Sequence, residues 1–132
     1  MNKLNLVKLS FLKEKLFRLN TQRTNYIISI LHGKEMVFGM PLRVYRKCGK
    51  KNCKCHTGKR HGPYPALSVN KQGKQKIVMI KKTDTSSVLY GAEIYKHYQR
   101  TLAKIRKIDK DINNILVQLK SDTTIDYIPK QK

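Results

Sequence analysis

The sequence predicts an α+β protein in which long N- and C-terminal helices flank a small β-hairpin module with a loop rich in Cys and His. Two observations lead to this fold class. Both ends of the 132-residue chain place apolar residues every three or four positions, which is the helical period. The middle alternates apolar and polar residues, which is the period of a strand. A chain of this length forms one domain, or one small module with helical arms.

The N-terminal helix is predicted over residues 2–31, which contain neither Gly nor Pro. Its apolar positions follow the heptad spacing of a coiled coil, with one polar break at Arg23. They are Leu9, Leu12, Leu16, Leu19, Tyr26 and Ile30. Gly33 is a suitable stop, because Gly readily takes the left-handed conformation that ends a helix. We therefore assign residues 1–33 to this helix.

A second, longer helix is predicted from Thr85 to Lys120. Its apolar stripe comprises Ile94, Tyr98, Leu102, Ile105, Ile108, Ile112, Ile115 and Leu119. Lys96, Arg100 and Lys107 fall on the opposite face. We assign residues 84–120 to this helix and residues 121–132 to a flexible tail.

The length of the two helices indicates how they are packed. A helix of about 30 residues spans about 45 Å, which is too long to cover one core of about 50 residues. We therefore expect the helices to pair with each other as a coiled-coil-like arm, or with a second copy in a homodimer. The alternative is that each apolar stripe covers the middle module.

The middle module, residues 34–83, is predicted to be β-structure. Leu42 and Val44 alternate with polar neighbours, and Leu67 and Val69 do the same. Residues 75–81 are rich in β-branched and apolar side chains, and residues 70–74 carry a turn signal. We expect one strand, then a cysteine loop, then a hairpin.

The loop between Cys48 and His61 holds three thiols and two imidazoles within fourteen residues. Zinc binds four sulfur or nitrogen ligands tetrahedrally, and Cys3His is a regular set. Cys48, Cys53 and Cys55 would supply the sulfurs, and His61 is the preferred fourth ligand. His56 stays as the alternative ligand, although it follows Cys55 directly and one ion would strain to bind both. The loop therefore predicts a structural Zn²⁺ site.

The surroundings of this loop fit a metal site. Four lysines, Lys47, Lys50, Lys51 and Lys54, are expected to lower the thiol pKa and to offset the negative charge of three thiolates. A module with few large apolar residues also needs stabilisation from outside its core, which a bound metal ion would supply. Two alternatives stay open: reduced cysteines without a metal, and a redox or nucleophilic cysteine. The second lacks a CxxC pair and an acid that could orient a His.

The run PLRVYRKCGKKNCKCHTGKRHGPYPALSV resembles the core of a small, functionally uncharacterised bacterial and archaeal family. That family has the pattern Cys-x4-Cys-x-Cys, a Gly-containing spacer, His-Gly-Pro-Tyr and a strand, followed by a charged helix. The resemblance covers about residues 41–120. It implies that Cys48, Cys53, Cys55 and His61 form one set without His56. Members often occur beside transposases and in mobile elements, and no activity is implied.

The charge pattern indicates a polyanionic partner. The chain has 29 Lys and Arg against 8 Asp and Glu, and residues 36–83 hold thirteen of the basic residues and no acid. The candidate nucleic-acid contacts are Arg43, Arg46, Lys47, Lys50, Lys51, Lys54, Lys59, Arg60, Lys74 and Lys76. The excess of Lys over Arg favours recognition of phosphate over bidentate base reading. Tyr45 and Tyr64 would either stack on exposed bases or pack in the core. We favour DNA over RNA, although charge alone does not distinguish them.

Three function classes follow. The first is a nucleic-acid-binding protein with structural zinc, acting as an accessory or regulatory factor of a mobile element or phage. The second is a protein-interaction factor, an inhibitor or adaptor that docks on a nucleic-acid enzyme or ribonucleoprotein. The third, a metal-dependent nuclease, is disfavoured because residues 36–83 lack carboxylates and Asp109 and Asp111 have no partnering His. We expect no enzyme and no catalytic residues.

The chain is expected to be cytoplasmic, without a membrane partner. Its longest apolar run, Tyr26 to Leu31, is far shorter than the roughly 20 residues that a membrane span needs. Lys8 and Lys13 interrupt the apolar N-terminus, which argues against a signal peptide. Three cysteines, an odd number, do not form a secreted disulfide framework.

Overall fold

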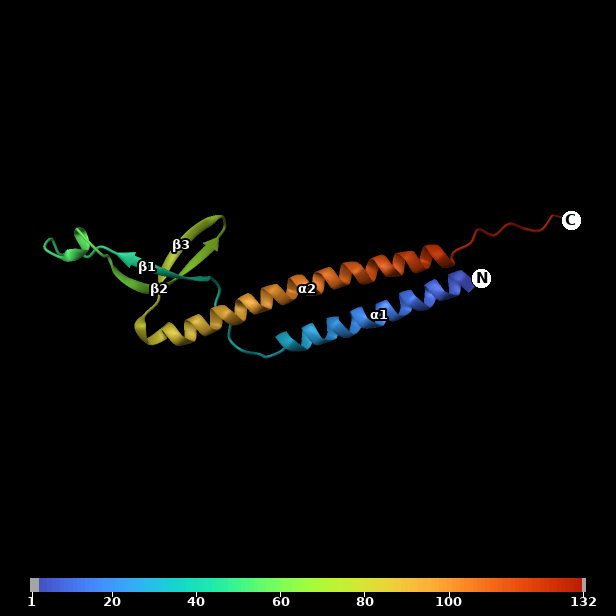
Figure 1. The fold of residues 1–132 in the computed structure, drawn as a ribbon, viewed down its shortest axis with the longest axis horizontal. Coiled ribbons are helices and arrows are strands. Elements are labelled where there is room, and N and C mark those ends of the chain that lie inside the picture. The colour runs from blue at the N-terminus through green and yellow to red at the C-terminus, as the bar shows by residue number, and fades with distance from the viewer. Residues whose placement is uncertain (1–2, 132) are drawn as a thin grey trace. The chain divides into compact units, whose positions relative to one another are not determined.

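A computed structural model describes residues 3–131. The elements are α1 (Lys3–Ile30), β1 (Met40–Arg46), the short 3₁₀ turn η1 (Lys54–His56), β2 (His61–Lys71), β3 (Lys74–Met79), a second 3₁₀ turn η2 (Lys82–Asp84) and α2 (Thr85–Thr123) (Figure 1). The α+β class and the order of helix, strand, cysteine loop, hairpin and helix are confirmed. The chain forms two compact units. The helical unit combines α1 with α2 from Gln99 onward, and the β unit runs from Lys34 to Tyr98.

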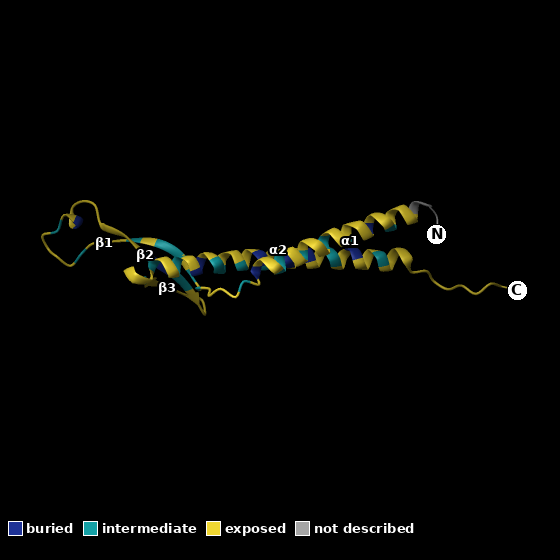
Figure 2. Ribbon diagram, turned by 90° about the horizontal axis from the view of Figure 1, so that it is seen from below, coloured by how far each residue is buried: buried dark blue, intermediate teal, exposed yellow. Residues whose placement is uncertain are grey.

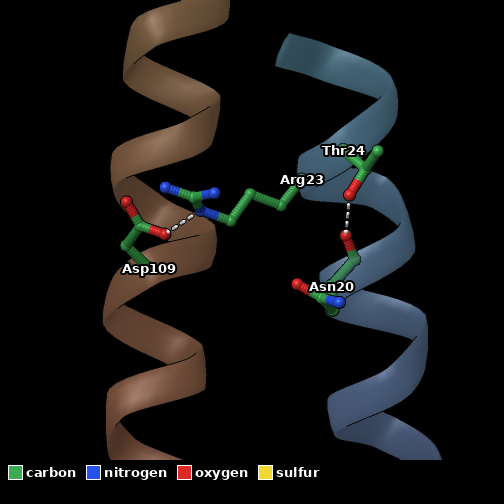
Figure 3. Close-up of polar contacts among 4 residues, drawn as sticks. All are labelled: Asn20, Arg23, Thr24 and Asp109. Carbon is green, nitrogen blue, oxygen red and sulfur yellow. Dashed lines mark hydrogen bonds and ion pairs between the residues drawn. The ribbon is translucent and has the colours of Figure 1, made fainter. Parts of the chain in front are cut away.

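In the helical unit, α1 and α2 lie side by side and antiparallel (Figure 1). Lys8 Nζ lies 3.4 Å from Asp122 Oδ2 near one end of the pair. Further along, the Arg23 guanidinium forms an ion pair with Asp109, and Figure 3 shows the two side chains reaching across from their helices. Arg23, the polar break in the heptad pattern, therefore has an acidic partner on α2.

The predicted apolar stripes are the inward faces of this unit, except for Ile94 and Tyr98, which belong to the β unit. Leu12, Ile30, Ile105, Ile108 and Ile115 are buried, and the other predicted stripe positions are half-buried. Lys96, Arg100 and Lys107 are exposed, as expected. Both helices nevertheless remain exposed over most of their surface (Figure 2). Knobs-into-holes packing and a homodimer stay predictions.

The β unit contains a three-stranded antiparallel sheet with the order β1-β2-β3. β2 and β3 are joined at Gln72 and Gly73, which have φ of 54° and 77°. This is the backbone of a two-residue hairpin turn, and it matches the predicted turn at residues 70–74. On the other side, β1 pairs with β2 from Met40↔Ser68 to Arg46↔His61, with an irregularity between Val44 and Arg46.

The core of the β unit is thin. Among its described residues, the buried apolar side chains are Cys55, Ala66, Leu67 and Ala92. The segment before β1 also packs closely on the first part of α2, where a Cβ on Gly91 would lie 2.6 Å from Val37 Cγ2. The Phe38 and Tyr95 rings make an edge-to-face contact with centroids 5.4 Å apart. So small a core leaves stability to be supplied by other means.

Within residues 3–131, no helix has the combination of length and apolar character that a membrane span requires.

Candidate metal centre

The three cysteines and His61 come together where the β1–β2 connection joins the sheet. β1 ends at Arg46 and β2 begins at His61, so the intervening loop starts and finishes at one end of the sheet (Figure 1). Cys48 follows β1, Cys55 lies in η1, and His61 is the first residue of β2. The pairing of Arg46 with His61 holds the two ends of the loop together.

The four side chains form one tight cluster. The potential ligand atoms of Cys48, Cys53, Cys55 and His61 all lie within 4.8 Å of one another. Cys55 Sγ lies 3.4 Å from Cys48 Sγ, and Cys53 Sγ lies 3.1 Å from His61 Nε2. Tetrahedral zinc with Zn–S bonds of about 2.3 Å would place two sulfurs about 3.8 Å apart. The donor set and its spacing therefore fit a four-coordinate metal ion.

Local backbone contacts shape the loop around the cluster. The Cys48 N–H donates to Cys55 Sγ at 3.2 Å, and the Cys53 N–H donates to the Lys50 carbonyl at 3.3 Å. Cys55 is only 1% exposed, whereas His61 is exposed. Such a cluster has one anchored sulfur and an open side at which an ion can enter.

His56, the alternative ligand, lies outside the cluster. Its Nε2 is 2.8 Å from the Lys50 carbonyl oxygen, so its imidazole contacts the loop backbone instead. The adjacency of Cys55 and His56 explains this arrangement, because successive side chains point in different directions.

Gly62 allows β2 to run close beside β1 directly after His61. Its φ is 130°, a conformation that favours Gly, and a Cβ there would lie 2.7 Å from the Val44 carbonyl oxygen. A larger residue would push β2 away from β1 directly beside His61. The sequence predicts a bend at Gly62, and the structure shows that β2 already begins one residue earlier, at His61.

The thiols differ in acidity. The pKa of the Cys53 thiol is lowered to about 6, first by a hydrogen bond with the Cys55 backbone and then by side-chain contacts with Cys48, Cys55 and His61. At Cys48 the Lys50 backbone lowers the pKa, but contacts with the other two thiols and burial outweigh it and raise the pKa. The expected lowering of the thiol pKa is thus found at Cys53 and not at Cys48, and lysine side chains are not its cause at Cys53. Hydrogen bonds within the cluster have the larger effect.

The predicted basic contacts surround this cluster and extend over the sheet. Arg43 and Arg46 lie on β1, Lys54 on η1, and Lys74 and Lys76 on β3. The others lie in the loop on either side of η1: Lys47, Lys50, Lys51, Lys59 and Arg60. All ten are exposed. The structure therefore leaves their charges available, and it gathers six of the ten, Lys54 included, between β1 and β2 in the loop that carries the thiols.

Pairs of these cations line two concave surfaces of the β unit. One, of about 370 Å³, is lined by Lys71, Lys74 and Lys76 together with Phe38, Val69 and Val78. The other, of about 340 Å³, is lined by Arg46, Lys47, Cys48, His61, Tyr64 and Met79. Met79 could not be assigned to this surface from the sequence, because strand alternation does not reveal which residues of different strands become neighbours.

Fold and site together define a small α+β protein with a basic β unit and a Cys3His cluster. Residues 21–89, just over half of the chain, match a family described as a domain of unknown function (DUF6788), and the chain belongs to that family. The match includes the whole cluster and the three strands, and it ends within the first part of α2. No curated protein and no solved structure gives a significant match.

Proposed function

We propose that this protein binds nucleic acid through its β unit, and that a structural Zn²⁺ on Cys48, Cys53, Cys55 and His61 holds that unit together. The observation that carries the proposal is the acid-free stretch of residues 36–83, which holds thirteen basic residues together with the Cys3His cluster. A surface of this kind attracts phosphate, because each contact releases condensed counterions. DNA is the favoured ligand, and an enzymatic role is not part of the proposal.

The zinc assignment is supported by the chemistry of the donors. Three thiolates and one imidazole suit zinc better than Mg²⁺ or Ca²⁺, which prefer oxygen ligands. The apolar core of the β unit comprises only four described residues, so a bound ion would have to stabilise its fold. A place in a mobile element or phage, as an accessory or regulatory factor, is supported by the resemblance to a family found beside transposases.

The test is a salt series on duplex DNA with two matched triple variants. If the β unit contacts about five phosphates, log affinity should fall against log salt with a slope of about −4 to −5. Replacing Lys50, Lys51 and Lys54 with Gln should reduce that slope by up to about 3 and weaken binding to all sequences alike. The control replaces Lys96, Arg100 and Lys107, exposed cations of α2, and should have a smaller effect.

A second candidate function is docking on a protein partner, favoured by the outer surface of α1. Leu6, Phe11, Phe17 and Ile28 are 52%, 57%, 73% and 62% exposed, which is unusual for side chains of this size. An inhibitor or adaptor of a nucleic-acid enzyme would use such a surface, and so would a homodimer. A flat salt response, or equal losses from the two triple variants, would favour this function over the first.

A further inference from the structure

The groove beside the cluster combines two chemistries that one nucleotide also combines. Arg46 and Lys47 supply positive charge, while Tyr64 and Met79 supply a flat ring and an apolar surface. None of the residues that line it is acidic. Its volume of about 340 Å³ lies at the lower end of the range of small-ligand pockets.

The sheet register explains why the ring and the cations meet. Tyr64 and Ala66 lie on the same face of β2, and Met79 pairs with Ala66, so Tyr64 and Met79 are neighbours on that face. Val44 pairs with Tyr64 across β1. The irregularity between Val44 and Arg46 lets β1 end at Arg46 opposite His61, and Lys47 and Cys48 follow directly.

Tyr64 is 42% exposed, and it lies just before Ala66, where the pairing of β2 with β3 begins. An aromatic ring exposed in a groove with adjacent cations can stack on a base while the cations contact the flanking phosphates. A paired base does not offer its face, because its neighbours in the duplex already cover both sides. The groove therefore suits an unpaired nucleotide and not a base pair.

We propose that this groove binds an unpaired nucleotide of a single strand, with its base on Tyr64 and Met79 and its phosphates on Arg46 and Lys47. This inference rests on the proposed function and specifies the form of nucleic acid that the β unit prefers. Cys48 and His61, two residues of the cluster, also line the groove, so the cluster helps to shape it. Cations continue beyond it along the loop and on β3, which gives a longer strand further contacts.

The test compares a single-stranded DNA oligonucleotide with a matched DNA hairpin by fluorescence anisotropy, with zinc content measured on every sample. Tyr64→Leu should weaken single-strand binding about tenfold and leave hairpin binding unchanged, because only the stacking contact is lost. Tyr64→Phe should retain single-strand affinity. Tyr45→Leu is the matched control, since Tyr45 is 48% exposed and does not line the groove, and it should have little effect.

A second measurement needs no variant. A 2-aminopurine base in the oligonucleotide should lose fluorescence when the unaltered protein binds, because the base stacks on a ring. Absence of quenching on binding, or equal effects of Tyr64→Leu and Tyr45→Leu in folded proteins, overturns the inference and leaves the proposed function intact. A protein with affinity for neither probe overturns both.

Discussion

Cys53 and His56 lie three positions apart in one loop, yet their environments predict opposite effects of substitution on metal binding. The sulfur of Cys53 is 3.1 Å from His61 Nε2, and hydrogen bonds within the cluster lower its pKa to about 6. A thiol of this acidity is largely thiolate at neutral pH, the form that binds a metal. The His56 imidazole contacts only the Lys50 carbonyl among the hydrogen bonds assigned to its ring.

Cys53→Ser should therefore reduce bound zinc from about one ion per chain to a small fraction of that. Removing a group that only hydrogen-bonds to a metal ligand typically lowers metal affinity tenfold to hundredfold. Removing a ligand itself should lower it by at least as much. His56→Ala should keep its zinc and its melting temperature. Elemental analysis of the dialysed proteins decides, and equal zinc in the two variants would contradict the assignment of the cluster.

At the scale of the elements, much of the fold is predictable from local pattern. The stripes of both helices, the turn before Lys74 and the grouping of four potential metal ligands between residues 48 and 61 all follow from residue spacing. Arg23 looked like a defect in a heptad repeat, because its partner Asp109 is 86 residues away and no local pattern links them. Long-range ion pairs of this kind require the antiparallel register, which spacing alone does not supply.

The start of β2 is the element that the sequence hides. Pro63 and Pro65 argue against a central strand, because Pro cannot donate to the ladder. The register accommodates them: β3 pairs with β2 only from Ala66 to Lys71, so both prolines precede the part of β2 that has strands on each side. The groove at Tyr64 and Met79 could not be predicted either, since it depends on the register in which three strands pair.

The α1–α2 pair makes its own prediction through Ile105, which is 8% exposed. Ile105→Asp places a charge in the packed stripe and should lower the free energy of unfolding by about 3 kcal/mol or more. Val117→Asp is the control on the same helix, because Val117 is 58% exposed, and it should change stability by less than about 0.5 kcal/mol. Denaturant titration followed by helical circular dichroism measures both. Similar midpoints for the two variants would mean that the stripe is not a packing surface.

For the whole molecule, the decisive feature is the uneven distribution of charge and core. The helical unit buries five large aliphatic side chains along its stripes, and its two described ion pairs involve Asp109 and Asp122. The β unit instead holds the acid-free run of thirteen basic residues on a core of four small or medium apolar side chains. Self-repulsion acts against compactness in the β unit more than in the helices. A metal ion bound to the cluster would supply folding free energy that offsets this repulsion.

Removing the metal should therefore affect the two units differently. A structural zinc contributes on the order of 10 kcal/mol to folding, far more than so small a core can replace. After treatment with a zinc chelator, backbone amides from Met40 to Met79 should lose most of their protection against hydrogen exchange. Amides of α1, and of α2 from Gln99 onward, should keep theirs, because the stripe around Ile105 and Ile108 contains no cluster ligand.

Hydrogen exchange read by mass spectrometry gives both regions in one experiment, and the control is the choice of ion added back. Zn²⁺ should restore protection in the strands, whereas Mg²⁺ should not, since it prefers oxygen ligands in octahedral geometry. If the metal-free protein kept the same protection from Met40 to Met79, the β unit would be stable on its thin core alone. The cluster would then be a set of reduced thiols in a basic loop. The basic residues around it would then have binding of nucleic acid as their role, with no part in offsetting the charge of a metal site.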